Sequence, residues 1–298
     1  MIGETIKYPE HIYRYRFPTM NSIAALMENK CFFSTSNYYD DPFDTYLRID
    51  FNVIDDYVNQ FFENPKQAFE SVMQKKIDND QDIDFLKSIN REELAKRVRE
   101  VFKGIRNDLR KRVHSICFSG MPTNESLWLK YADSHKGFVI EYDTKVPLVI
   151  MSDNDIEQKS TVPQLTLGLY PMFYSNEKFD ATEYARDLLA QKILGQLFPQ
   201  MQDTIPQWLP PHHWESERIT LIKKKCHEPD EEWRMILGSP YLIKNPIYLK
   251  WKPTRVIIGL NTDDSTRRLI IEAAKIAQID RISEIIINKA DELEVNDL

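Results

Sequence analysis

The sequence predicts an α+β fold built on a mixed, mostly antiparallel sheet. Short apolar runs with alternating side chains, such as residues 12–17 and 137–142, predict strands. Two long stretches with helical periodicity interrupt these runs, at about residues 53–112 and 176–225. Strands broken by helical blocks, without a regular strand–helix alternation, are typical of α+β domains. We therefore expect one elaborated domain over residues 1–298 that carries two helical insertions.

Composition restricts the class of protein. The 298 residues, 42% of them hydrophobic, suffice to bury a full core. No apolar run approaches the roughly 20 residues that cross a bilayer, and the first residues lack the pattern of a secretory signal. Three widely separated cysteines predict reduced thiols, and neither a disulfide framework nor a zinc site. We expect a cytoplasmic protein without a membrane partner.

Charge and glycine content argue against two further classes. The net charge of −7 does not suit a protein that coats nucleic acid. The 8 glycines form neither of the phosphate-binding patterns that mark Rossmann and P-loop sites.

The N-terminal segment is expected to run strand, helix, strand and loop. Residues 12–17 alternate aromatic and basic side chains, and Asn21 is expected to cap a helix over residues 22–29. Residues 31–34 return as a strand, and residues 40–44 form an acidic loop that contains Pro42. We predict that this loop packs against the first strand and is held there by Arg14 or Arg16.

The rest of the chain alternates expected strands with expected helices. A helix over residues 124–133 places Trp128 and Tyr131 three residues apart, on one helix face. The stretch 215–225 is expected to be helical, as is 265–277. The expected strands cover residues 113–119, 137–142, 168–174, 233–237, 255–260 and 282–287.

Charged or hydroxyl side chains stand beside large aromatic residues in or next to these strands. Ring faces combined with fixed charges hold polar, planar ligands, so the pattern predicts a binding cleft on the sheet. The candidates are Arg14, Tyr15, Arg16, Ser119, Trp128, Tyr131 and Glu232.

Several of these candidates also have a structural interpretation. The two arginines could pair with the acidic loop, and Glu232 with Arg234 or a lysine of 223–225. Trp128 could belong to the core. Ser119 could cap the turn after its strand. Cys117, in an apolar strand, is expected to be a small buried side chain.

A series of motifs follows in order along the chain: Tyr13-Arg14-Tyr15, Asp40-Asp41-Pro42-Phe43-Asp44, Cys117-Phe118-Ser119, Leu127-Trp128, Tyr131-Ala132-Asp133, His135-Lys136-Gly137 and Glu232-Trp233-Arg234. This order resembles a family of bacterial proteins known only as a domain of unknown function. The resemblance covers roughly residues 12–259, and the chain departs from the family at Arg14, at Asp40 and at His227, Pro229 and Asp230.

A looser resemblance is to ADP-ribosyltransferases, which place a basic residue, a hydroxyl residue and a glutamate around NAD. On this chain it implies Arg14, then Ser119 or Tyr131, then Glu232. It also implies an ADP-ribosyltransferase-like core, NAD as substrate and no metal. Glu232 would be catalytic, and NAD would be bound by Arg14, Tyr15, Arg16, Ser119, Trp128 and Tyr131.

Cleavage of the nicotinamide–ribose bond builds positive charge on the sugar, which a carboxylate such as Glu232 stabilises. The acceptor could be protein, nucleic acid or water, in a toxin or a phage-defence effector. The alternative is a non-catalytic module that binds a nucleotide or a peptide in the same cleft. A nuclease is disfavoured because the acidic loop has no second carboxylate cluster to hold paired magnesium ions.

Overall fold

The computed structural model describes residues 7–39, 41, 44–45, 47–64, 113–152, 166–187, 215–238 and 246–298, with isolated positions between 66 and 111. The chain divides into two compact units. Unit 1 comprises Met1–Asp40, Arg112–Tyr174 and Lys223–Leu298, and unit 2 comprises Asp41–Lys111 and Ser175–Ile222. The residue ranges of the two segments of unit 2 overlap those of the expected insertions, 53–112 and 176–225. The single elaborated domain stays a prediction.

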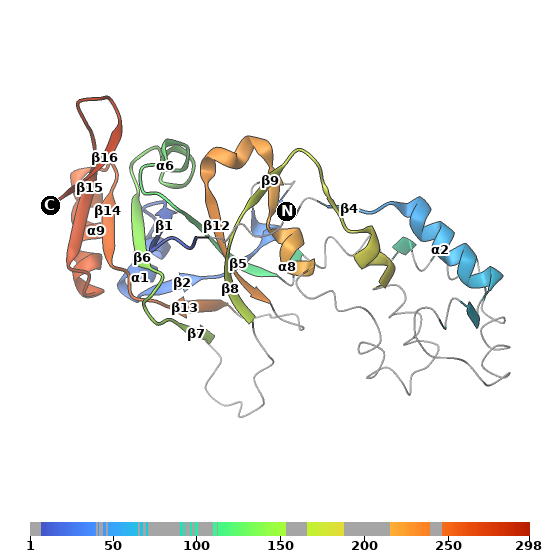
Figure 1. Ribbon diagram of the computed structural model, residues 1–298. Coiled ribbons are helices and arrows are strands. Elements are labelled where there is room, and N and C mark those ends of the chain that lie inside the picture. The colour runs from blue at the N-terminus through green and yellow to red at the C-terminus, as the bar shows by residue number, and fades with distance from the viewer. Residues whose placement is uncertain are drawn as a thin grey trace. The chain divides into compact units, whose positions relative to one another are not determined.

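Unit 1 is built on a nine-stranded sheet (Figure 1). β14 pairs with β15 in parallel, and the other pairings of this sheet are antiparallel. The expected mixed, mostly antiparallel sheet is therefore confirmed. Its strands, in spatial order, are β16 (Leu293–Asp297), β15 (Arg281–Ile287), β14 (Arg255–Ile258), β6 (Phe138–Asp143), β1 (His11–Arg16), β5 (His114–Ser119), β12 (Glu232–Gly238) and β8 (Thr166–Pro171), with β3 (Ser34–Thr35) paired to β5.

Smaller sheets and helices complete the described chain. A three-stranded sheet contains β2 (Lys30–Phe32), β13 (Ile247–Lys250) and β7 (Val149–Ser152), and β9 (Phe173–Ser175) pairs with β11 (Ile222–Lys224). The helices of unit 1 are α1 (Met20–Met27), α6 (Glu125–Tyr131) and α9 (Asp264–Ile276), with 3-10 helices η1 (Ser36–Tyr38) and η4 (Lys225–Asp230). Unit 2 contains β4 (Leu47–Arg48), α2 (Phe51–Glu63), β10 (Phe179–Asp180), a helical stretch at 182–187 and α8 (Glu215–Thr220).

Two expected element boundaries are corrected. Thr19, not Asn21, caps α1, because its backbone is extended and its hydroxyl oxygen accepts the Ser22 N–H. The helix expected over 215–225 ends with α8 at Thr220. The chain then turns into β11, which pairs with β9, and into η4, which contains Pro229. Strand pairing therefore overrides the helical pattern of residues 222–225.

The two faces of the nine-stranded sheet differ in what covers them. On the α1 face, Ile12, Phe118 and Ile140 join a core with Leu26 of α1 and Ile270 of α9. The opposite α6 face carries Tyr13 and Tyr15 of β1, which pack with Leu127 and Trp128 of α6. Because side chains alternate along a strand, consecutive residues of β1 belong to different faces.

Candidate functional site

A row of paired residues crosses the α6 face. Tyr13 pairs with Glu141 on one side and with Ser119 on the other, and Ser119 pairs in turn with Glu232 of β12. Directly paired residues point to the same face of a sheet. Glu232 and Ser119 therefore share the α6 face with Tyr13, and so does Arg234, two residues further along β12.

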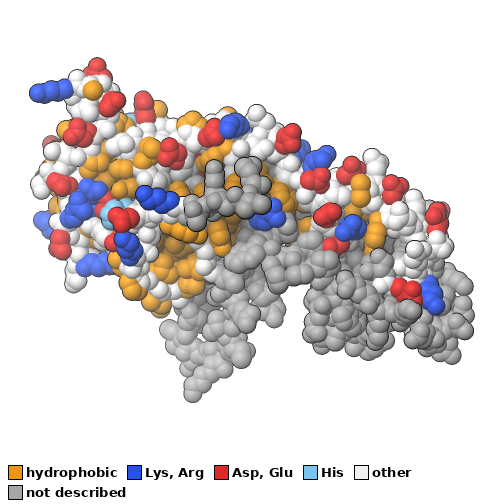
Figure 2. Space-filling view, viewed as in Figure 1, with side chains coloured by type: hydrophobic (Ala, Val, Ile, Leu, Met, Phe, Trp, Pro, Cys, Tyr) orange, Lys and Arg blue, Asp and Glu red, His pale blue; other side chains and the backbone are white. Residues whose placement is uncertain are grey.

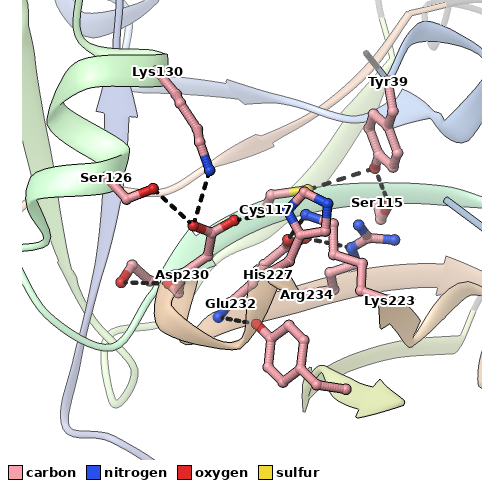
Figure 3. Close-up of polar contacts among 12 residues, drawn as sticks. Tyr39, Ser115, Cys117, Ser126, Lys130, Lys223, His227, Asp230, Glu232 and Arg234 are labelled. Atoms are coloured by element: carbon pink, nitrogen blue, oxygen red, sulfur yellow. Dashed lines mark hydrogen bonds and ion pairs between the residues drawn. The ribbon is translucent and has the colours of Figure 1, made fainter. Parts of the chain in front are cut away.

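Glu232 is a buried carboxylate held between two cations (Figure 3). Lys223 Nζ donates to Oε2 at 2.6 Å, and Arg234 Nε donates to Oε1 at 2.5 Å. The side chains of Lys223 and Arg234 are 6% and 1% exposed. Pairing of Glu232 with Arg234 and with a lysine of 223–225, one of the structural interpretations drawn from the sequence, is thus confirmed.

These partners decide the charge of Glu232. Burial alone raises the pKa of its carboxyl, but the charges and hydrogen bonds of Arg234 and Lys223 outweigh burial and hold this pKa at about 2. The carboxylate is therefore ionised at neutral pH. Its backbone N–H donates to the hydroxyl of Tyr174 at 2.8 Å, which fixes the start of β12.

A second group of polar side chains lies further along β5. The Tyr39 hydroxyl shares a short hydrogen bond with Ser115 and accepts one from the thiol of Cys117, at 3.7 Å. The Arg234 guanidinium lies 4.9 Å from the centre of the Tyr39 ring. The expectation of a buried Cys117 is corrected: its side chain is half-buried and polar in its contacts.

Asp230, just before β12, joins this region to α6. Its Oδ1 accepts from Ser126 at 3.2 Å and lies 3.5 Å from Lys130 Nζ, while its Oδ2 lies 3.5 Å from His227 Nδ1. Figure 3 shows Ser126 and Lys130 on one side of this carboxylate and His227 on the other.

Two tyrosines lie close enough to these carboxylates to feel their charges. Burial, then the charges of Glu232 and Asp230, raise the pKa of Tyr131, with Lys223 opposing them. Burial likewise raises the pKa of Tyr174 to about 12. The Tyr131 side chain is 39% exposed, so its ring borders solvent. We call Glu232, Lys223, Arg234, Asp230 and tyrosines 39, 131 and 174 the Glu232 cluster.

The structure does not bring the two arginines of β1 to this cluster. Arg14 donates to Cys31 Sγ and to the carbonyl of Phe32, and Arg16 donates to Ser22 Oγ. Neither has a carboxylate partner among the residues that the structure describes. By strand alternation both project from the face opposite to Glu232. The predicted packing of loop 40–44 lies outside the described residues, since Asp40, Pro42 and Phe43 are not described.

The remaining candidates lie on the α6 face with structural contacts. Trp128 is fully buried in α6, and its ring packs edge-on against Tyr15, which is 8% exposed. The Ser119 hydroxyl accepts the Met121 N–H and donates to the carbonyl of Asp230, so it caps the turn after β5 as one interpretation expected. Of the predicted site residues, Ser119 and Tyr131 lie beside Glu232.

Sequence reasoning missed several members of this region. Ser115 and Cys117 could have been predicted, because every second residue of a strand points to the same face and both therefore share the face of Ser119. Tyr39, Tyr174 and His227 carry no such signal, since the fold brings them to the site from turns and other strands.

The described ranges contain neither a metal-ligand cluster nor a membrane-spanning helix. No group of three or more His, Cys, Asp or Glu side chains there could hold a metal ion. No helix among the same residues is long and apolar enough to cross a bilayer.

Figure 2 shows acidic and basic side chains interspersed over the visible face, with apolar side chains between them.

Comparison with known proteins adds no relative. A scan against protein-family models, a search of curated proteins and a search of solved structures each find no match. Both resemblances drawn from the sequence therefore stay predictions.

Proposed function

We propose that this protein binds NAD at the Glu232 cluster and transfers its ADP-ribose group to an acceptor. The observation that carries the proposal is an ionised glutamate on a sheet face, set between two cations and bordered by tyrosines. Fixed charge of this kind suits a reaction that develops positive charge on a sugar. An ADP-ribosyltransferase-like core, implied by the resemblance, is part of the proposal.

The cluster offers the chemistry that a dinucleotide requires. Lys223 and Arg234, buried and paired with Glu232, supply positive charge that favours a pyrophosphate nearby. Tyr131, 39% exposed, offers a ring face on which a nicotinamide or an adenine can stack. In this arrangement Lys223 and Arg234 take the role that the resemblance gives to Arg14, because Arg14 projects from the other face of β1.

The proposed reaction breaks the bond between ribose C1′ and the nicotinamide nitrogen. The bonding electron pair leaves with nicotinamide, which becomes neutral, and the ribose gains oxocarbenium character. The Glu232 carboxylate stabilises this charge. An acceptor oxygen or nitrogen then bonds to C1′ and releases its proton to a base. Protein, nucleic acid or water can serve as acceptor, and a toxin or phage-defence role stays a prediction.

A second candidate function is binding without chemistry. Lys223 and Arg234 engage both carboxylate oxygens of Glu232, at 2.6 and 2.5 Å. A carboxylate bound in this way can serve to hold the two cations in place for an anionic ligand. Such a module would bind a nucleotide and leave it intact.

Two measurements on the wild-type protein separate these functions. Calorimetry with NAD measures binding, and nicotinamide release in the presence of cell extract, which supplies acceptors, measures cleavage. The proposal expects both binding and release, with release unchanged by a metal chelator. Binding without release under any acceptor selects the non-catalytic module. Absence of binding and of release overturns both functions.

A further inference from the structure

The turn before β12 holds an imidazole against a buried carboxylate. His227 precedes Asp230 by three residues in η4, and its Nδ1 lies 3.5 Å from Asp230 Oδ2. The Asp230 side chain is 3% exposed, whereas that of His227 is 27% exposed. In this pair a buried carboxylate therefore contacts an imidazole ring that is partly exposed to solvent.

Asp230 is held from other directions as well. Ser126 Oγ donates to Oδ1 at 3.2 Å, and Lys130 Nζ lies 3.5 Å from the same oxygen. The backbone carbonyl of Asp230 accepts from Ser119. With Oδ1 directed to α6, Oδ2 is the oxygen that faces His227 (Figure 3).

This pair belongs to the neighbourhood of Glu232. Asp230 stands two residues before Glu232 in the chain. After burial, the main cause, the charges of both carboxylates raise the pKa values of Tyr131 and Tyr174. His227 thus contacts a carboxylate that stands two residues before Glu232, to which the proposed function assigns the sugar.

The proposed transfer needs a base that Glu232 cannot supply well. Both Glu232 oxygens accept hydrogen bonds from cations, and its pKa of about 2 makes it a weak base. A proton acceptor works best when its pKa lies near the operating pH, as histidine side chains allow in general.

We propose that His227 is the general base that takes the acceptor's proton, and that Asp230 is its positioning residue. The inference rests on the proposed function. In the neutral imidazole, Nδ1–H donates toward Asp230 and the lone pair remains on Nε2. As the acceptor oxygen or nitrogen bonds to C1′, its proton passes to Nε2, and Asp230 stabilises the imidazolium that forms.

The first test compares transfer rates of variants at saturating NAD. His227→Ala is expected to lower the rate about 100- to 10,000-fold, with NAD affinity within about twofold of wild type. Added imidazole should restore part of the rate, because the His227 position is partly open to solvent. His227→Gln keeps a donor for Asp230 but cannot take a proton, so it should stay inactive. His11→Ala, a half-buried histidine at the start of β1, is the control and should match wild type.

The second test needs no activity. Nitrogen-15 NMR of the neutral imidazoles identifies which ring nitrogen carries the proton. We expect the Nδ1–H tautomer for His227 in wild type and loss of that preference in Asp230→Asn.

The outcomes separate this inference from the proposed function. No transfer or release by wild type overturns both. Normal transfer by His227→Ala, or recovery of transfer by His227→Gln, overturns the role of His227 and leaves the proposed function standing. An Nε2–H tautomer in wild type overturns the role of Asp230.

Discussion

The charge of Glu232 links the candidate site to folding stability. Its pKa in the folded protein is about 2, below the ordinary value of 4.5, because Arg234 and Lys223 outweigh the effect of burial. A depressed folded pKa means that the ionised form stabilises the fold. This contribution is present in full above pH 4.5 and is lost as the pH falls toward about 2.

Glu232→Gln should therefore flatten the pH dependence of stability. Over this acid window, the free energy of unfolding of wild type should fall by on the order of 3 kcal/mol more than that of the variant. The variant should also be less stable at neutral pH, since it leaves Lys223 and Arg234 without the carboxylate. Urea denaturation at a series of pH values measures both effects. Parallel curves for the two proteins would contradict this account.

A substitution of Trp128 tests whether this residue stabilises the core or contacts a ligand. It is fully buried, stacks on His135 with ring centres 5.5 Å apart, and donates Nε1–H to the carbonyl of Pro122. Trp128→Phe should lower the free energy of unfolding by about 1–3 kcal/mol, from lost volume and a lost hydrogen bond. NAD affinity measured by calorimetry should stay within about twofold. A tenfold loss of affinity at normal stability would instead place Trp128 on the ligand.

Among the elements, the connection between α6 and β6 depends on close backbone packing. Asp133, Ser134 and His135 have φ of 50°, 53° and 67°, in the left-handed region. The chain then reaches Gly137, where an added Cβ would lie 2.2 Å from the carbonyl oxygen of Arg16. The Cα and the carbonyl oxygen of Ala132 would lie 3.1 Å from the same Cβ. All these atoms belong to the backbone, so they cannot move aside as the end of a flexible side chain could.

Gly137→Ala is expected to destabilise the fold by about 1–3 kcal/mol through this clash. The matched control is Gly120→Ala, whose Cβ would meet Trp233 at an ordinary 3.6 Å. Thermal or urea denaturation of the two variants compares them directly. Equal stability of the two would show that the α6–β6 connection relaxes freely.

Most elements of unit 1 could be predicted because their sequence patterns are local. The strand pattern at 137–142 corresponds to β6, and the helix expected at 265–277 corresponds to α9. β16 was missed because its acidic sequence, Leu293–Asp297, is largely exposed at the sheet edge and lacks an apolar pattern. β11 was missed because its lysines follow a helical pattern and only pairing with β9 makes it a strand.

The site was less predictable than the fold. The pairing of Glu232 with Arg234 follows from their spacing on one strand and is one of the interpretations that the sequence allows. The contact of Tyr39 with Ser115 and Cys117 depends on how a turn meets β5, which no local pattern specifies. The position of Arg14 in the chain order agrees with the resemblance to ADP-ribosyltransferases. Side chains alternate along β1, however, so Arg14 projects from the face opposite to Glu232.

At the scale of the whole molecule, three separate segments of unit 1 meet in one sheet with β6 and β1 at its centre. Each of these strands is paired on both sides, and Val139 and Phe138 are fully buried. Amide hydrogen exchange should therefore be slowest in β1, β6 and β14 and faster in the edge strands β16 and β8. Mass spectrometry of exchanged peptides checks this order. Protection of β16 equal to that of β6 would contradict it.

The proposed action of the Glu232 charge on NAD can be tested directly by one comparison. Nicotinamide release is measured for wild type, Glu232→Gln and Glu141→Gln, each shown to be folded by circular dichroism. Glu141 is the matched control, because it is also buried on the α6 face and paired with an arginine, Arg255. Glu232→Gln should lower release about 100- to 1,000-fold with little change in NAD affinity, and Glu141→Gln should retain it. Release at the wild-type rate by folded Glu232→Gln, or an equal loss in Glu141→Gln, would contradict the claim.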